Sequence, residues 1–205
     1  MPKTREQNEV IKRKRRGEII QAGLKLFALK GYDNVTINNI TTAAGCSHGL
    51  FYHYFNSKID LLKSILTSIR SVADVYVKRF EEAEHNIAEI FSHIVRYVFS
   101  ELNNPRNLLF AYRAHIWFTL HLQKTLPTEK KTKEKSLYLS PYVFIEQTFT
   151  KGQLSGKFKT NHSAPEYALI AFNLLQSIIY NRVHLSFRRF KAPAAETFIN
   201  LFVMR

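Results

Sequence analysis

The sequence predicts an all-α protein, and three observations support that fold class. Apolar residues recur at spacings of three and four through most of the 205 residues, which is the period of an amphipathic helix. Glycine and proline are scarce, with seven and six copies, so few turns interrupt the chain. The alternation of apolar and polar residues that marks a half-buried strand is also scarce. We therefore expect about nine helices packed as a bundle.

Three helices are expected at the N-terminus. Residues 13–30 carry an apolar stripe, and Gly31 supplies the left-handed residue with which a helix often ends. Thr36 is the expected N-cap of a second helix that Gly45 terminates, and Ser47 is the expected N-cap of a third helix that runs to about residue 55. The short turn between the last two predicts a helix-turn-helix unit.

Six further helices are expected in the rest of the chain. A charged loop is expected over residues 124–136, and Ser163 with Glu166 matches a capping box. The segment 104–121 is apolar nearly all round, which favours a central, buried position. We expect residues 1–56 to form one domain and residues 57–205 to form a second one. The expected helices cover residues 57–83, 86–102, 104–121, 141–151, 163–187 and 193–205.

The formal net charge of +14 bears on the partner of the protein. Seven of the first sixteen residues are Lys or Arg, with a basic run at 12–16. Such an arm attracts nucleic-acid phosphates, but it equally suits an anionic membrane surface or a solvated tail. Cys46 is the one cysteine, which excludes an internal disulfide and suits a reducing cytoplasm. No secretory signal and no membrane span are expected, because the N-terminus is charged and no uncharged apolar run is long enough.

The sequence offers little for catalysis or for binding a cofactor. The eight histidines form no HxxxH or HExxH pair, and no P-loop or Rossmann glycine pattern occurs. No nucleophile with a neighbouring base can be identified. We therefore expect no catalytic residue, no metal site, no cofactor and no enzymatic activity.

The third helix divides its side chains between two faces. At about 100° per residue, His48, Gly49, Tyr52 and His53 fall on one side, whereas Leu50, Phe51, Tyr54 and Phe55 fall on the other. A recognition helix requires this division, because the apolar face anchors it while the polar face enters the major groove. Gly49 lets the backbone come close to DNA.

The segment 19–62 carries a characteristic set of residues, which consists of Ala22, Leu26, Phe27, Lys30, Gly31, Tyr32, Thr36, Ile40, Ala44, Gly45, Ser47, Gly49, Phe51, Tyr52, His53, Tyr54, Phe55, Ser57 and Lys58. With these residues the segment resembles the DNA-binding domain of the tetracycline-repressor (TetR) family. The resemblance implies an all-helical homodimer with a DNA-binding domain at one end and a ligand pocket in the larger C-terminal domain. Thr41, Cys46 and Leu50 depart from the common residues of the family, and Leu50 puts one family DNA contact in doubt.

The function expected from these features is sequence-specific binding of a double-stranded DNA operator in the cytoplasm, with repression relieved by an apolar or aromatic small molecule. The alternative is a non-catalytic protein of the same fold that binds another protein. Candidate DNA contacts are Thr36, Ser47, His48, Gly49, Tyr52, His53 and Lys58. Candidate ligand contacts are the polar or aromatic residues Arg113, His115, Trp117, His121, Asn173 and Gln176.

A homodimer is expected to form through two apolar stripes near the C-terminus. The alternative is that both stripes only close the core of one chain. The stripes consist of Leu169, Phe172, Leu175, Ile179 and Val183 in the segment 163–187, and of Phe198, Leu201 and Phe202 near the chain end.

Overall fold

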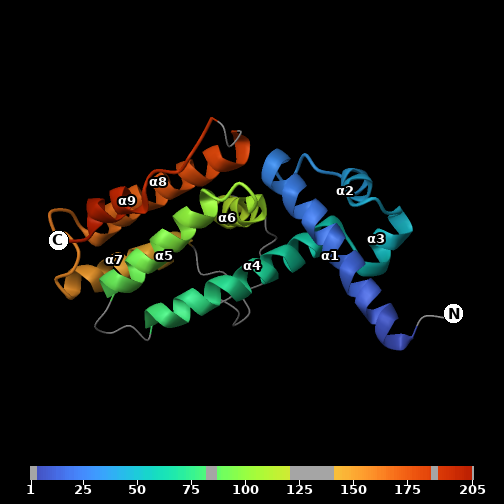
Figure 1. Cartoon of the computed structure of the whole chain (residues 1–205), viewed down its shortest axis with the longest axis horizontal. Helices are drawn as coiled ribbons and strands as arrows, with labels where there is room; N and C mark the ends of the chain where they lie inside the picture. Colours follow the sequence, from blue (N-terminus) through green and yellow to red (C-terminus); the bar gives the residue numbers. More distant parts are fainter. Residues whose placement is uncertain (1–3, 82–86, 121–140, 186–188, 205) are drawn as a thin grey trace. The chain divides into compact units, whose positions relative to one another are not determined.

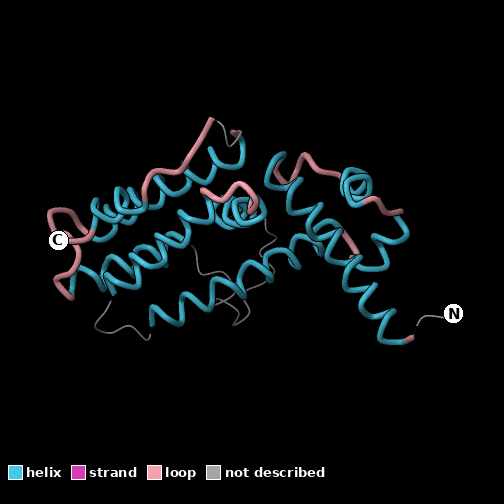
Figure 2. The backbone as a smooth tube through the Cα atoms, in the orientation of Figure 1, coloured by secondary structure: helices cyan, strands magenta, loops and turns pink. Residues whose placement is uncertain are grey.

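The computed structural model describes residues 4–81, 87–120, 141–185 and 189–204, and these ranges hold nine helices (Figures 1 and 2). No strand occurs in them, and one isolated β-bridge pairs Phe158 with Val203. The predicted all-α fold class is thereby confirmed. None of the described helices is long and apolar enough to cross a membrane. The helices are α1 Arg5–Lys30, α2 Ile37–Ala44, α3 His48–Tyr54, α4 Lys58–Glu81, α5 Ile87–Leu102, α6 Leu108–Leu120, α7 Pro141–Leu154, α8 Ala164–His184 and α9 Ala195–Phe202.

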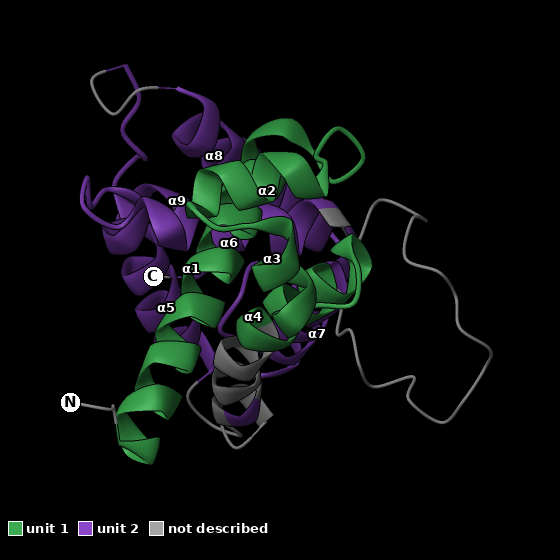
Figure 3. Ribbon diagram, turned by 90° about the vertical axis from the view of Figure 1, so that its right-hand side faces the viewer, with its two compact units in different colours: residues 1–69 green, residues 70–205 purple. Residues whose placement is uncertain are grey.

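The chain divides into two compact units, Met1–Ile69 and Arg70–Arg205 (Figure 3). Helix α4 continues through this division from Lys58 to Glu81. The domain boundary expected between residues 56 and 57 marks the end of the helix-turn-helix and stays a prediction.

Helix α1 begins eight residues earlier than the sequence pattern indicated. Thr4 caps it, because the Thr4 hydroxyl accepts a hydrogen bond from the Gln7 N–H while the Gln7 side chain accepts one from the Thr4 N–H. The basic run at residues 12–16 is therefore helical throughout, including Lys12, which precedes the expected start of the helix at residue 13. The first turns of α1 are exposed and carry no apolar stripe, so hydrophobic periodicity does not indicate them.

The expected caps of α2 and α3 are confirmed. The Thr36 hydroxyl accepts from the Asn39 N–H, and the Ser47 hydroxyl accepts from the Leu50 N–H. Between them, Gly45 ends α2 with a φ of 61°, a left-handed conformation that a side chain would strain. These local signals fix the length of the turn between the two helices.

The second unit is built around a cluster of aromatic rings. Phe149 of α7 is fully buried and lies 5.0 Å from Phe202 of α9, 5.2 Å from Phe158 and 5.9 Å from Tyr167 of α8, measured between ring centroids. Phe91 of α5 contacts the same Phe158 ring at 5.1 Å. Four helices thus share one aromatic core.

Helix α7 continues past Gly152, where the sequence pattern predicted its end. Gly152 lies within the helix, and a Cβ atom there would come within 2.5 Å of the Phe158 ring. The glycine therefore serves close packing rather than helix termination. Helices α6 and α8 are also shorter than expected, since Asn104 and Pro105 precede α6 and α8 ends at His184. The charged loop expected at 124–136 lies outside the described residues.

Most of the two apolar stripes expected in the dimer interface lie in the core of the chain. In α8, Phe172, Ile179 and Val183 are buried, whereas Leu169 is exposed. In α9, Phe198 and Phe202 are buried and Leu201 is exposed. The alternative interpretation, that the stripes close the core of one chain, is correct for these five buried residues.

Candidate nucleic-acid interface

Helix α3 has the predicted apolar and polar faces, with Phe51 and Phe55 buried and with Leu50 and Tyr54 half-buried. Phe51 and Phe55 are 0% and 1% exposed, and their rings lie 5.7 Å apart beneath the helix. Tyr52 is 53% exposed, and its ring lies perpendicular to that of Phe51 with the centroids 5.5 Å apart. The helix is therefore anchored by phenylalanines while its outer face is free to contact a partner. The other candidates on that face, His48, Gly49 and His53, are exposed as well.

Thr36 and Ser47 are exposed at the starts of α2 and α3, with their hydroxyls engaged as caps. The Thr36 hydroxyl also donates to Asn39 Oδ1 at 2.9 Å, so both of its roles serve the helix end. Contacts of these two residues with phosphate stay predictions.

Lys58 lies at the start of α4 and is tied to the segment between α1 and α2. Its Nζ donates to the carbonyl oxygens of Tyr32 and Val35, each at 2.9 Å, and lies 4.1 Å from the centroid of the Tyr32 ring. Two of the three ammonium hydrogens are thus used inside the domain. The expected phosphate contact of Lys58 stays a prediction, and its positioning role is a feature that the sequence did not reveal.

The basic run of α1 is partly neutralised by neighbouring side chains. Lys12 pairs with Glu9 at 3.1 Å, and Arg15 pairs with Glu18 at 2.7 Å. Arg16 lies 5.1 Å from the Phe55 ring centroid and donates to Ser64 Oγ, so it holds α1 to the end of α3 and to α4. Arg13 and Lys14 are also exposed, and no ion pair involves them among the described residues.

Asn38 is a residue of the candidate interface that the sequence pattern did not predict. Asn38 is exposed in the first turn of α2, and its Oδ1 lies 3.3 Å from His48 Nε2 at the start of α3. The signal available was its position next to the Thr36 cap on a short, polar helix. The partner was not predictable, because the contact joins two helices.

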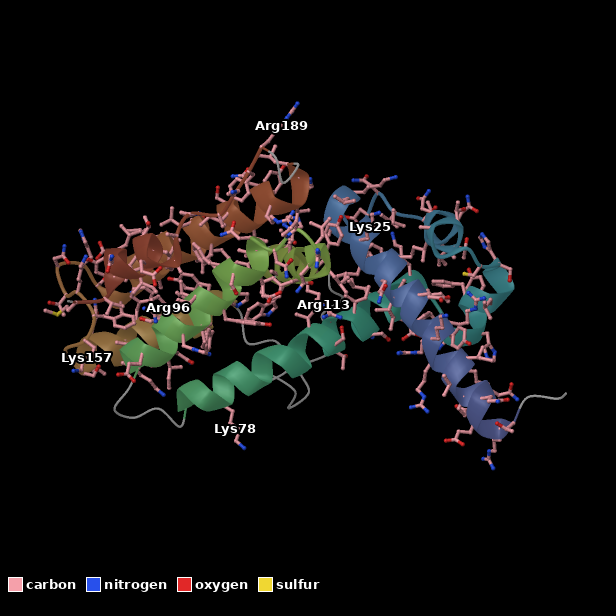
Figure 4. All side chains as sticks on the ribbon, in the orientation of Figure 1. Lys25, Lys78, Arg96, Arg113, Lys157 and Arg189 are labelled. Carbon is pink, nitrogen blue, oxygen red and sulfur yellow. The ribbon has the colours of Figure 1, made fainter. Side chains whose placement is uncertain are left out.

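The candidate ligand residues of the second unit are not brought together. Arg113 is exposed on α6 (Figure 4), and Asn173 is exposed on α8, where its amide donates to the Leu169 carbonyl oxygen. Trp117 and Gln176 are half-buried, and His121 lies outside the described residues. Within the described ranges no hydrogen bond, ion pair or ring contact joins any two of these residues, and their role stays a prediction.

His115 is the one buried member of this set among the described residues. It is 8% exposed, its Nδ1 has no hydrogen-bond partner, and its ring lies 5.4 Å from that of His184. Burial, together with the neighbouring His184, lowers the pKa of His115 to about 4. The imidazole is therefore neutral at pH 7.

Comparison with known proteins agrees with this geometry. The family model described as "Bacterial regulatory proteins, tetR family" matches residues 19–65, which include α2 and α3. The HTH-type transcriptional regulator HbdR of Aromatoleum sp. (strain CIB) is 42% identical over 62 residues, or 30% of this chain. That match spans 26% of the length of HbdR, so it concerns the N-terminal domain and not the whole relative.

Solved structures extend the likeness of fold to the whole chain. The HlyIIR mutant protein aligns with a TM-score of 0.65 at 15% identity and covers 100% of both chains. The SmeT–triclosan complex aligns with a TM-score of 0.59 at 15% identity, covering 93% of this chain and 92% of that chain. Residues 19–65 of the chain thus match the tetR family of bacterial regulatory proteins, and the fold of the whole chain is similar to the folds of HlyIIR and SmeT.

Proposed function

We propose that the protein is a sequence-specific DNA-binding transcriptional regulator, namely a repressor that a small-molecule effector releases from its operator. The two faces of α3 carry the proposal: Phe51 and Phe55 fill the core, which leaves Tyr52 and its exposed neighbours to meet base edges. The alternative, a protein of this fold that binds another protein, is not favoured, because the outer face keeps polar and small groups. The site of action is the cytoplasm.

Electrostatic attraction to the DNA backbone comes from the exposed cations of α1. Arg13 and Lys14 form neither an ion pair nor a contact with another helix among the described residues, whereas Arg16, which also lacks an acidic partner, contacts Ser64 and Phe55. Each phosphate neutralised by a cation releases counterions. The logarithm of the binding constant therefore falls linearly with the logarithm of the salt concentration. We expect the double variant Arg13→Gln/Lys14→Gln to bind every duplex more weakly. The slope of the logarithm of its binding constant against the logarithm of the salt concentration should be smaller in magnitude by about two.

Fluorescence anisotropy over a salt series, with duplexes selected from a random library, tests the proposal. The exchange of Lys12 and Arg15 for Gln is the matched control, because both already pair with glutamates and should change the slope less. Wild-type protein that selects no duplex, or binding that is indifferent to salt, would contradict DNA binding.

A helix-turn-helix DNA-binding domain of this size commonly acts as a dimer, in which each copy contacts one half-site of the operator. In the second unit, α8 exposes a set of large apolar residues to solvent that one chain leaves uncovered. A second copy of the same chain would bury this face. The set consists of Leu169, Ile170, Leu174 and Tyr180.

The effector is expected to act through α4, which spans residues of both compact units. Lys58 in its first turn is hydrogen-bonded to the segment that precedes α2. A shift of α4 would therefore move the helix-turn-helix. The effector must bind the DNA-incompetent state more tightly, with a coupling of about 1–3 kcal/mol.

The test is to screen apolar aromatic compounds, with triclosan among them, for those that raise the melting temperature. Each compound that does so is then titrated into the protein–DNA complex. By reciprocity, DNA must weaken the binding of that compound by the same factor. A compound that binds tightly and leaves DNA affinity unchanged would refute this coupling.

A further inference from the structure

The side chains of Asn38 and His48 form a contact that links the two helices of the reader. Asn38 Oδ1 lies 3.3 Å from His48 Nε2, and both residues are exposed on the domain that carries the recognition helix. Neither residue packs into the core. The contact therefore orients two polar groups at the outer face and adds little to burial.

Asn38 is held in place by a second hydrogen bond from its own helix. The hydroxyl of Thr41, a residue only 2% exposed, donates to the Asn38 carbonyl oxygen at 3.1 Å. The Thr41 carbonyl oxygen in turn accepts from the Cys46 N–H at 3.0 Å, within the turn that precedes α3. Through these two hydrogen bonds the backbone of Asn38 is linked to the turn before α3. The side-chain amide of Asn38 contacts His48.

The orientation of the Asn38 amide decides which ring nitrogen of His48 carries the proton. In this structure the amide oxygen faces Nε2, and because an amide oxygen only accepts hydrogen bonds, this orientation selects the form with the proton on Nε2. A neutral imidazole has one N–H, and Nδ1 is therefore left as an acceptor. Among the described residues no hydrogen bond occupies Nδ1.

This proton arrangement restricts what His48 can recognise on DNA. Phosphate oxygens only accept hydrogen bonds, so they offer nothing to an acceptor nitrogen. In the major groove, the hydrogen-bond donors are the amino groups of adenine (N6) and cytosine (N4), whereas guanine presents two acceptors.

We propose that His48 reads the amino group of an adenine or a cytosine through Nδ1, and that Asn38 is the positioning residue that selects this tautomer. The proposal rests on the proposed function, in which α3 enters the major groove. It assigns a chemical preference to one position of each half-site.

The first test measures the tautomer in the absence of DNA. Imidazole nitrogen shifts of the ¹⁵N-histidine-labelled full chain distinguish the Nε2–H form from the Nδ1–H form, and His48→Gln identifies the signal by its loss. We expect the Nε2–H form in the wild type and a mixture of both forms in Asn38→Leu, which keeps the side-chain size but removes the acceptor. A wild-type Nδ1–H form, or no change in Asn38→Leu, would overturn the role of Asn38.

The second test selects duplexes from a random library with the wild type, His48→Ala and Asn38→Leu. A lost base contact costs five- to 150-fold in discrimination at one base pair. We expect this loss at a single adenine or cytosine position in His48→Ala and a smaller loss at the same position in Asn38→Leu. Thermal melting of each variant, expected to match the wild type, shows that the effect is not unfolding.

The outcomes of the selection separate the two proposals. Wild-type protein that selects no duplex would refute the proposed function. Wild-type protein that selects duplexes, with unchanged preferences in His48→Ala or with guanine at the affected position, would refute the base contact alone.

Discussion

The ammonium group of Lys58 lies 4.1 Å from the centre of the Tyr32 ring and donates to the carbonyl oxygen of the same tyrosine at 2.9 Å. One residue thus offers Lys58 both an aromatic face and a backbone acceptor. This arrangement fixes the first turn of α4 to the segment that precedes α2, with Val35 as the second acceptor.

Lys58→Met should lower the stability of the N-terminal unit, because it removes two charged hydrogen bonds and a cation–π contact while keeping the apolar stem. We expect a loss of about 2 kcal/mol in the free energy of unfolding, measured by urea denaturation. If Lys58 instead served mainly as a phosphate contact, the salt slope of DNA binding would fall by about one with no loss of stability. Lys25→Met, at an exposed position of α1, provides the comparison.

Tyr52→Ala and Phe51→Ala should separate binding from folding on one helix. Tyr52 is half-exposed, so its truncation should abolish DNA binding with little change in melting temperature. Phe51 is fully buried, so its truncation should cost about 3–5 kcal/mol of stability. Circular dichroism melts and anisotropy on the same samples give both quantities. Equal melting of the two variants would contradict the assignment of faces.

Gly49→Leu should prevent DNA binding without unfolding the protein. A Cβ atom at Gly49 meets only the Ser47 hydroxyl, at 3.9 Å, so the folded chain has room for a side chain. On DNA the same side chain would hold the backbone away from the groove. Gly17→Leu, at a glycine of α1 with nothing within 4 Å, is the matched control for stability. Full DNA affinity in Gly49→Leu would place this turn of α3 away from the groove.

His115 should make the second unit sensitive to acid. Its pKa is lowered from 6.5 to about 4 in the folded chain, so between these values the unfolded chain binds a proton that the folded chain does not. Stability therefore falls as the pH decreases through that window, by at most about 3 kcal/mol.

Replacement of His115 by leucine removes the proton and should reduce the difference between the free energies of unfolding at pH 7 and pH 4. Carboxyl groups titrate in the same range, so the variant is compared with the wild type at each pH. His93→Leu, at an exposed position of α5, is the control. An identical pH dependence in His115→Leu and the wild type would show that this imidazole does not contribute.

The outer face of α8 should mediate dimer formation. Leu174 is exposed on that face, and Leu174→Glu should convert a dimer of two 23.9-kDa chains into monomers in sedimentation at micromolar concentration. Leu154→Glu introduces the same charge at a residue that is 83% exposed at the end of α7 and should leave the dimer intact. A wild-type monomer would exclude this interface.

The helix-turn-helix was predictable from sequence because its signals are local. Thr36, Gly45 and Ser47 act within three residues of their own positions, and the faces of α3 follow from helical geometry. The start of α1 was missed because its cap, Thr4, precedes exposed residues that have no apolar stripe.

Contacts between helices were not predictable in this way. An apolar stripe such as Phe172 to Val183 shows that a face is buried, but not whether the same chain or a second one buries it. The partners of Lys58 and His48 lie 26 and 10 residues away, and no spacing rule connects them.

Gly152 and Phe158 also bear on how relatives of this chain can vary. The Phe158 ring is fully buried and occupies the space that a side chain at position 152 would need. In chains that share this second unit, the two positions should therefore change together: a larger residue at 152 requires a smaller one at 158. A Gly152→Ala variant that folds poorly should be rescued by Phe158→Leu. The pair is thus a point at which mutations in this region depend on one another.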